Sequence, residues 1–432
     1  MHFDAPKNNN YAATVVSVRT MIELEGLDNL VGVPVLGHQA LTEKGLTPGQ
    51  LRVAFTAETQ LSPDYCAINN LYRDATLNKD PAETGYLEKN RRVRALKLRG
   101  HTSNALLMPL SSLAYTGVDV RGLLEGDTFD TLNGHEICRK YEIPVKHVQG
   151  RGKTKVEKAF RRVDTKLFPE HLETDQYHRN KHLLKAGREV VITQKLHGTS
   201  WRGGRVPVLR QSKWYERFLR KLGVTIPVYE YATVFGSRKV IKDPDNPNQN
   251  HFYKDDIWTD YGKKIADLIP EGYLVYGELV GWTSDGAPLQ KGYTYHLPKG
   301  DAELFVYRVA HINQQGHLSD LSWDGVKDFC RARGLKWVPE IGRLFMHPKG
   351  DLDDDVNELL DVRFSDQYIT DAADDWFVEE PLKLSDKKTV DEGVCLRQDG
   401  LVPLILKAKS PKFLEHETKL LDKGEADLES LS

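Results

Sequence analysis

Short apolar runs separated by Gly, Pro and Asn dominate the first third of the chain. They include ATVVSV at 13–18, VGVPVLG at 31–37, QLRVAF at 50–55 and RVRALKL at 92–98, with few long helical periods between them. Runs of this length with turn residues at their ends are typical of β-strands. Together they predict a small β-barrel, and the OB-fold is a common one on proteins that handle nucleic acids. Any other small β domain is the alternative.

The pattern changes between about Glu142 and Phe168, where the chain becomes charged, rich in Gly and Lys, and without apolar periodicity. We place a domain boundary there. Beyond it, strand-like runs alternate with helical segments, which predicts a mixed sheet with helices. The runs are 188–196, 228–240, 272–282, 302–312, 392–398 and 401–409. Helices are expected at 213–223, which is amphipathic and basic on one side, and at 323–334.

Length and composition limit the possible classes of protein. A chain of 432 residues exceeds one ordinary hydrophobic core, so two domains are expected. No apolar run approaches the ~20 residues of a membrane-spanning helix, and the start MHFDAPKNNN lacks a signal-peptide pattern, so we expect a cytoplasmic protein. Four scattered cysteines, Cys66, Cys138, Cys330 and Cys395, form no CxxC pair and are expected to be reduced and mostly buried.

Charge is balanced overall but segregated along the chain. The formal net charge is −2, yet 89–100 and 150–162 are strongly basic and 350–361 is acidic. This segregation indicates a positive face along which a nucleic-acid backbone passes, or, alternatively, ordinary solvated faces.

The stretch VVITQKLHGTS, residues 190–200, carries the first candidate chemistry. Because side chains alternate along a strand, Lys195 and His197 are expected on one side, and Gly198 would let a ligand approach the backbone. This arrangement suits a lysine nucleophile. Since an ordinary lysine has a pKa near 10.4, it needs nearby positive charge or desolvation to attack.

Four further charged residues interrupt apolar strands. Lys407 and Lys409 in LILKAK lie two apart, so both ammonium groups would face one side and could grip phosphate. Glu278 in LVYGELVG and Glu392 in DEGVCL should be paired, or should bind a metal or a ligand hydroxyl. Taken singly, the lysines suit a solvated strand edge and the glutamates structural ion pairs.

The order of these signals is more specific than any one of them. Lys-x-His-Gly, Ser-Arg, Tyr-Gly-Glu, an aromatic strand, Glu-Gly-x-x-Leu and Lys-x-Lys follow one another along the chain. The set resembles motifs I, Ia, III, IIIa, IV and V of the covalent nucleotidyltransferases, which comprise ATP-dependent ligases and mRNA capping enzymes.

Within that superfamily the resemblance is closest to nick-sealing RNA ligases. KLHGTS, with His197 where DNA ligases typically have Asp, is similar to the RNA ligase motif, as are APLQKGYTY after motif III and KAKSPKFLE around motif V. GQLRVAFTAETQLS and RVRALKLRGHTSNALLMPLS resemble the N-terminal OB module of the Deinococcus and Naegleria type. DNA ligases and capping enzymes place the OB domain after motif V instead.

The resemblance implies an α+β protein, with an N-terminal OB-fold β-barrel followed by a mixed α/β nucleotidyltransferase domain of the ATP-grasp-like ligase type. The implied limits are 1–144 for the OB domain, 145–168 for a linker, 169–422 for the nucleotidyltransferase domain and 423–432 for a tail.

The resemblance also implies a role for each matching residue. Lys195 would attack the α-phosphate of ATP to form lysyl-AMP, Glu278 would hold the ribose, and Tyr307, rather than Phe305, would stack on adenine. Arg238 would contact the adenylate or the RNA end, and Glu392 would organise a divalent metal.

The remaining implied site residues bind the nucleotide. Lys407 and Lys409 would hold the phosphates and assist departure of pyrophosphate, and Gln194, His197 and Gly198 complete the ATP or AMP site. The implied cofactors are ATP and Mg²⁺ or Mn²⁺, held by Glu392 and Glu278 mostly through water. The implied partner is nicked RNA or an RNA-containing duplex, no membrane is involved, and the protein is expected to be a monomer.

Two positions depart from the family pattern, and two other classes stay open. Many relatives have Asn at the position of Ser200 and Asp at the position of Arg308. A DNA ligase or GTP-using capping-type enzyme is one alternative, and His197 and the domain order argue against it. A non-catalytic nucleic-acid-binding relative is the other, and the presence of every charged motif position argues against it.

Overall fold

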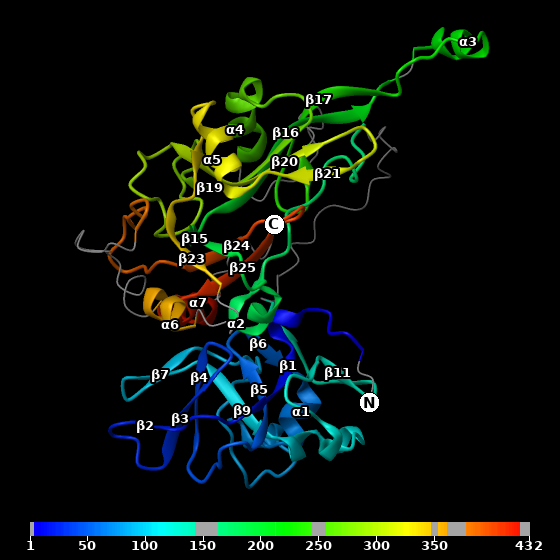
Figure 1. The fold of residues 1–432 in the computed structure, drawn as a ribbon. Coiled ribbons are helices and arrows are strands. Elements are labelled where there is room, and N and C mark those ends of the chain that lie inside the picture. Colours follow the sequence, from blue (N-terminus) through cyan, green and yellow to red (C-terminus); the bar gives the residue numbers. More distant parts are fainter. Residues whose placement is uncertain are drawn as a thin grey trace. The chain divides into compact units, whose positions relative to one another are not determined.

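The computed structural model describes residues 4–142, 162–211, 213–242, 256–346, 353–360 and 377–423 (Figure 1). The chain divides into two compact units. The first comprises Met1–Pro144, Asp175–Lys181 and Lys409–Ala426, and the second comprises Val145–Thr174, His182–Ala408 and Asp427–Ser432. Most of the predicted linker at 145–168 and all but Lys423 of the predicted tail lie outside the described residues. None of the described helices is both long and apolar enough to span a membrane.

The first unit is built mainly from strands. Its main sheet has seven strands in the order β10-β1-β5-β9-β4-β3-β2. The pairings among the described residues leave β10 and β2 at opposite edges, so the sheet is open rather than a closed barrel. The bounds are β1 Ala13–Ser17, β2 Ile22–Glu23, β3 Leu30–Val35, β4 His38–Glu43, β5 Leu51–Thr56, β6 Thr59–Leu61, β7 Leu96–Leu98, β8 His101–Ser103, β9 Ala105–Pro109, β10 Thr128–Phe129, β11 Thr131–Leu132, β12 His135–Glu136, β13 Cys138–Lys140, β14 Asp175–Gln176, α1 Pro63–Ile68, α2 Tyr177–Asn180 and α7 Pro411–Asp422.

Both faces of the central strand β5 are buried, which explains why its sequence is a nearly continuous apolar run rather than an alternating one. On β5, Val53 and Phe55 belong to one hydrophobic cluster and Ala54 to another. The first cluster includes Tyr65 of α1, whose ring lies 5.3 Å from that of Phe55 at 63°. The apolar pattern at 50–55 therefore predicted the strand correctly.

Helix α7 belongs to the first unit, although it follows motif V in the sequence. The Arg92 side chain is fully buried; its Nη1 lies 3.1 Å from Glu58 Oε1, and its Nη2 contacts Asp422 of α7. The Ala95 N–H donates to Thr418 Oγ1 (3.1 Å). Part of the basic stretch at 89–100 is thus structural, because the buried Arg92 guanidinium pairs with carboxylates of the protein itself.

The second unit contains two sheets and supplies the predicted mixture of strands and helices. One sheet has the order β25-β24-β15-β23, and the other has β18-β17-β16-β19-β20-β21, with β22 parallel to β20. The bounds are β15 Glu189–Lys195, β16 Thr199–Leu209, β17 Tyr229–Gly236, β18 Ile241–Lys242, β19 Tyr273–Gly281, β20 Ala302–Ile312, β21 Leu318–Asp320, β22 Lys336–Trp337, β23 Glu340–Phe345, β24 Gly393–Gln398, β25 Leu404–Lys409, α3 Glu216–Lys221, α4 Ile257–Ile265, α5 Trp323–Arg331 and α6 Asp353–Glu358. This mixed α/β architecture confirms the coarse fold prediction.

Strand β16 was not predicted from its sequence, TSWRGGRVPVL. Its glycines are required by close packing, because a Cβ on Gly204 would lie 2.4 Å from the carbonyl oxygen of Tyr273. Pro207 is tolerated because the pairing of β16 with β19 ends at Gly204, so that only β17 is paired beside the proline.

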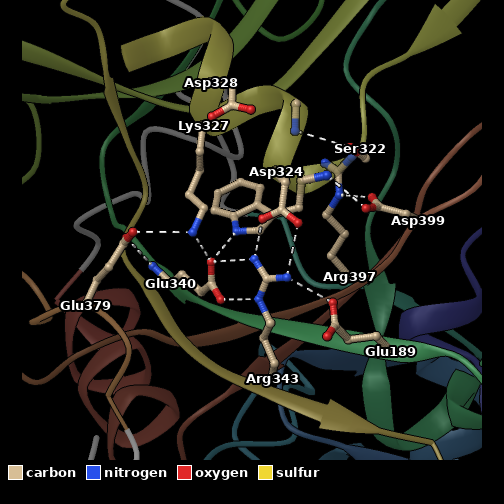
Figure 2. A network of polar contacts seen from close by, with 12 residues as sticks. Glu189, Ser322, Asp324, Lys327, Asp328, Glu340, Arg343, Glu379, Arg397 and Asp399 are labelled. Atoms are coloured by element: carbon tan, nitrogen blue, oxygen red, sulfur yellow. Dashed lines mark hydrogen bonds and ion pairs between the residues drawn. The ribbon is translucent and has the colours of Figure 1, made fainter.

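A buried carboxylate, Glu340, ties helix α5 to strand β23 (Figure 2). It accepts from Trp323 Nε1 (2.8 Å) and contacts Lys327 of α5 and Arg343 of β23. Arg343 in turn lies 3.1 Å from Glu189 of β15. Burial acts to raise the pKa of Glu340, but the hydrogen bonds from Arg343, Lys327 and Trp323 outweigh it and leave that pKa below its ordinary value.

We predict that Glu340→Ala lowers the free energy of unfolding by about 1.5–3 kcal/mol, because it removes the charged acceptor of hydrogen bonds from Trp323, Lys327 and Arg343, while both cations keep other carboxylate partners. Since the folded pKa is depressed, this stabilisation is present above the unfolded pKa of Glu340 and is lost as the pH falls through the folded pKa. Urea unfolding at neutral and acidic pH measures both effects. Asp328→Ala, which removes an exposed ion pair with Arg331, is the control and should change stability by less than about 1 kcal/mol. Equal stability of the two variants at neutral pH would refute the prediction.

Candidate active site

A pocket in the second unit is lined by strands of both of its sheets. Several of the predicted site residues therefore come together although they are distant in sequence. Its lining comprises His171, Leu172, Thr174, Thr193, Gln194, Lys195, Leu196, Ser200, Arg238, Tyr276, Glu278, Tyr307, Arg308, Trp323, Val338, Cys395, Arg397 and Ile405.

Lys195 is the last residue of β15, opposite Gly393 of β24. This pairing brings it beside the residue before Gly393: Lys195 Nζ lies 2.8 Å from Glu392 Oε1. The other carboxylate oxygen, Oε2, lies 3.2 Å from His197 Nδ1. Glu392 is only 1% exposed, whereas the Lys195 side chain is 14% exposed and lines the pocket. One buried carboxylate thus contacts both distinctive side chains of the KLHG segment.

Gly198 is held against β19. Its N–H donates to Glu278 Oε1 (3.1 Å), and a Cβ at this position would lie 2.4 Å from the carbonyl oxygen of Leu279. The reason for the glycine is therefore the close approach of β19. The expectation that it lets a ligand approach the backbone stays a prediction.

Three residues that sequence reasoning did not select fix the KLHG segment from the other side. The Tyr295 hydroxyl accepts from the His197 N–H (2.8 Å), and Gln290 Nε2 donates to the Gly198 carbonyl (2.9 Å). The ring of Tyr293 packs edge-on against that of His197, with centroids 4.6 Å apart. All three belong to APLQKGYTY, whose family resemblance was the only available signal. Burial raises the pKa of Tyr295 well above its ordinary value, which keeps its hydroxyl neutral.

Gln194 has protein partners for its side-chain amide. Its Nε2 donates to Asp391 Oδ1 (2.8 Å) and to the Leu382 carbonyl (3.0 Å), and its Oε1 accepts from the Leu382 N–H (2.8 Å). Burial raises the pKa of Asp391 to about 7. These contacts anchor the segment that leads into Glu392, while a role for Gln194 in nucleotide binding stays a prediction.

Tyr307 lies at a β-bulge. In the register of β19 with β20, Tyr276 pairs with Arg308 and Gly277 with Val306, so Tyr307 is the extra residue. Bulges re-aim side chains, and Tyr307 lines the pocket whereas Phe305 is not among the residues that do. Stacking of Tyr307 on adenine stays a prediction.

His171, which the sequence gave no reason to select, contacts the Tyr307 hydroxyl through Nδ1. Its burial, together with the charges of Arg202, Arg238 and Arg308, lowers its pKa well below the ordinary value, so the imidazole is neutral. A neutral imidazole can accept a hydrogen bond from the Tyr307 hydroxyl at Nδ1, and this contact positions the Tyr307 ring.

The two residues that depart from the family pattern, Arg308 and Ser200, both line the pocket. Arg308, in place of Asp, is 1% exposed; its Nη2 donates to Asp320 Oδ2 (3.0 Å), and its guanidinium lies 4.5 Å above the Tyr276 ring. Ser200, in place of Asn, lines the pocket. The charge of Arg308 is therefore balanced locally by a carboxylate of β21.

The three predicted cations other than Lys195, which are Arg238, Lys407 and Lys409, differ in their position relative to the pocket. Arg238 lines the pocket. Lys407 lies on β25 two residues after Ile405, which also lines the pocket, so alternation puts both on one face of the strand. Lys409 falls in the first unit, where its Nζ lies 3.0 Å from Glu417 Oε1. Its predicted role in nucleotide binding is therefore still a prediction.

The cysteines and the metal ligands are the remaining sequence predictions that concern chemistry. All four cysteines are free; three are buried, and Cys395 is half-buried at the pocket. Among the described residues, no three His, Cys, Asp or Glu side chains gather into a metal-binding group.

A model of the RNA ligase family matches residues 188–409, just over half of the chain and all of the site strands from β15 to β25. The chain belongs to the RNA ligase family. It is therefore an enzyme of the nucleotidyltransferase type, as the motif order predicted.

Similar solved structures cover almost the whole chain. They include Naegleria gruberi RNA ligase variants solved with ATP and Mn, at 14% identity and TM-score 0.57 over 94% of this chain and 98% of that one, and at 13% identity and TM-score 0.55 over 95% and 99%. The same ligase with pyrophosphate matches at 14% identity and TM-score 0.54, over 94% and 98%. At these identities the similarity shows the fold. No curated protein matches the chain.

We predict that Tyr295→Phe lowers the RNA-ligation rate about fivefold, because it removes the hydrogen-bond acceptor of the His197 N–H, which is worth about 1 kcal/mol. Initial rates at saturating substrate measure this. Tyr231→Phe, on β17 of the same unit, is the matched control and should leave the rate unchanged. An unaltered rate in Tyr295→Phe would show that this contact does not hold the active conformation.

Proposed function

We propose that this RNA ligase is ATP-dependent and seals 3′-hydroxyl and 5′-phosphate ends at nicks through lysyl-AMP on Lys195. The observation that carries the proposal is the placement of Lys195 Nζ at the pocket, 2.8 Å from the buried carboxylate of Glu392. Family membership supports it, as do the similar Naegleria gruberi ligase structures solved with ATP, with AMP and with pyrophosphate.

In the first step Lys195 Nζ loses a proton and attacks the α-phosphorus of ATP. The new P–N bond forms as the bond to the bridging oxygen of pyrophosphate breaks, and pyrophosphate leaves with the electron pair. Glu392 positions the amine and, as the nearest carboxylate, is the proposed acceptor of its proton. Holding the amine in line with the phosphate is the chief contribution of the protein.

The charge of the pocket suits a nucleoside triphosphate. Lys195, Arg238, Arg308 and Arg397 line it together with a single carboxylate, Glu278. Arg308 and Arg397 form ion pairs with Asp320 and Asp399, which hold the two guanidinium groups in place and balance much of their charge. Tyr307 would stack on adenine, Glu278 would accept from the ribose, and Lys407 would add charge near the phosphates.

Mg²⁺ or Mn²⁺ fits the residues present. Glu392 and Glu278 would supply hard carboxylate oxygens and would hold the ion mostly through water, which suits an ion that keeps most of its hydration shell. Such an ion would neutralise phosphate charge.

The second and third steps use the same residues. A 5′-phosphate oxygen attacks the phosphorus of lysyl-AMP, the P–N bond breaks, and Lys195 regains its proton. The 3′-hydroxyl then loses its proton to solvent and attacks the activated 5′-phosphate; a phosphodiester bond forms as the bond to the bridging oxygen of AMP breaks, and AMP leaves with the electron pair.

We predict that α-labelled ATP transfers label to the wild-type protein and that Lys195→Met is unlabelled, because methionine has no nucleophilic nitrogen. Lys185→Ala, an exposed lysine of the same unit, is the control and should label normally. Gel assays with ATP and with GTP test this. Preferential, Lys195-dependent labelling by GTP would favour a capping-type enzyme, and binding of nicked RNA without sealing in ATP and Mg²⁺ would favour a non-catalytic relative.

We further propose that residues 1–144 form an OB-type module that binds duplex beside the nick, that the catalytic domain lies within 169–422, and that the protein is a cytoplasmic monomer. The supporting observation is a strand-rich first unit with exposed cations at Lys97 and Arg99. Lys97 Nζ lies 3.9 Å from Glu415 Oε2, and Arg99 Nη1 donates to the Gly26 carbonyl, while both side chains stay exposed.

The double variant Lys97→Ala, Arg99→Ala should therefore raise the KM for nicked RNA about tenfold, since each lost phosphate contact weakens binding. Labelling by ATP should be unchanged. Arg121→Ala, an exposed cation of the same unit, is the control. Equal loss of labelling and of sealing in the double variant would contradict the proposal that the first unit binds RNA while the catalytic domain reacts with ATP.

A further inference from the structure

The segment that joins β16 to β17, residues 210–228, is termed the hairpin tip here. It contains α3, which Figure 1 shows beyond the ends of both strands. Six large apolar side chains of the tip are exposed, led by Trp214 at 87% and Phe218 at 64%. They are Trp214, Tyr215, Phe218, Leu222, Val224 and Val228. Such a density of exposed apolar groups marks an interaction surface.

The tip is organised by its own polar contacts. Glu216 is buried, with Oε1 2.8 Å from Arg210 Nη1 and Oε2 accepting from the Lys213 N–H (2.9 Å). Arg210 Nε also donates to the Pro227 carbonyl (3.1 Å), which closes the base of the tip. The rings of Trp214 and Tyr215 pack edge to face at 5.9 Å. The exposed aromatic residues are thus displayed on an ordered segment.

Charge selects the kind of partner. The tip sequence has five Lys and Arg residues and one carboxylate, Glu216, which is already paired. Lys213, Arg220 and Lys221 are exposed beside the aromatic residues. Cations for phosphates beside rings for stacking are the combination by which proteins hold nucleic acid, whereas an apolar protein partner gains nothing from exposed cations.

We propose that the hairpin tip binds the RNA substrate away from the joined ends, with Trp214 and Phe218 stacking on bases and the three cations contacting phosphates. β16 begins at Thr199, four residues after Lys195, and its 11 residues extend about 36 Å. The tip therefore contacts RNA several base pairs from the nick. This inference rests on the proposed RNA substrate but on none of the adenylylation chemistry.

The test uses the full chain and a nicked RNA duplex without ATP. The dissociation constant is measured for duplexes whose arms extend more than about 40 Å, or less than about 20 Å, from the nick. Trp214→Ala, Phe218→Ala should weaken binding of the long duplex about tenfold and leave the short one unchanged. Lys213→Ala, Arg220→Ala, Lys221→Ala should lower the slope of log affinity against log salt by roughly two to three. Leu401→Ala, at an exposed apolar residue elsewhere in the second unit, is the control and should match the wild type.

Unchanged affinity of both multiple variants for the long duplex would overturn the proposal. A wild-type dimer that the aromatic double variant dissociates, with RNA affinity retained, would also overturn it and would assign the tip to a second copy of the chain. Labelling by ATP, measured separately, distinguishes failure of the proposed function. A wild-type protein that ATP does not label, but that shows the expected binding pattern, would refute the proposed adenylylation and leave the proposal for the hairpin tip intact.

Discussion

The buried carboxylate of Glu392 is the constraint on which the site depends. With 1% exposure it requires partners, and those partners are Lys195 at 2.8 Å and His197 at 3.2 Å. One pair of neighbouring strands, β15 and β24, brings these groups together, because Lys195 pairs with Gly393. The energetic need to pair a buried charge and the proposed need to place a nucleophilic amine are therefore met by the same contact.

The rest of the second unit keeps that contact in place. Tyr295 and Gln290 hold the backbone of His197 and Gly198, which follow Lys195, and Gln194 anchors the approach to Glu392 through Asp391. Farther away, Glu340 joins α5 to β23, the strand that flanks β15. A site built on strands and buried hydrogen bonds in this way is held more rigidly than one built on loops.

Much of the fold could be predicted because apolar runs with turn residues at their ends correspond closely to buried strands, as at β5, β15, β19 and β20. Strand β16 could not be predicted in this way. Gly203 and Gly204 are explained by close packing, and Pro207 is explained by the end of the pairing with β19; only the folded sheet shows these features. Membership of α7 in the first unit was equally invisible, because the contacts of Thr418 and Asp422 with residues 92–95 are long-range.

The sequence indicated the charged residues of the candidate site but not the residues that hold them in place. Lys195, Glu278 and Glu392 interrupt apolar strands, which makes them visible, whereas His171 and Tyr295 look like ordinary residues of polar loops. Selection of Tyr307 depended on strand register, and the bulge that singles it out leaves no mark in the sequence.

Peptide mapping by mass spectrometry after incubation with ATP and Mg²⁺ tests the central claim most directly. The account predicts one added AMP group, located on Lys195, that disappears when nicked RNA with a 5′-phosphate is supplied. An adenylate on another residue, or none in a protein that still seals RNA, would contradict it.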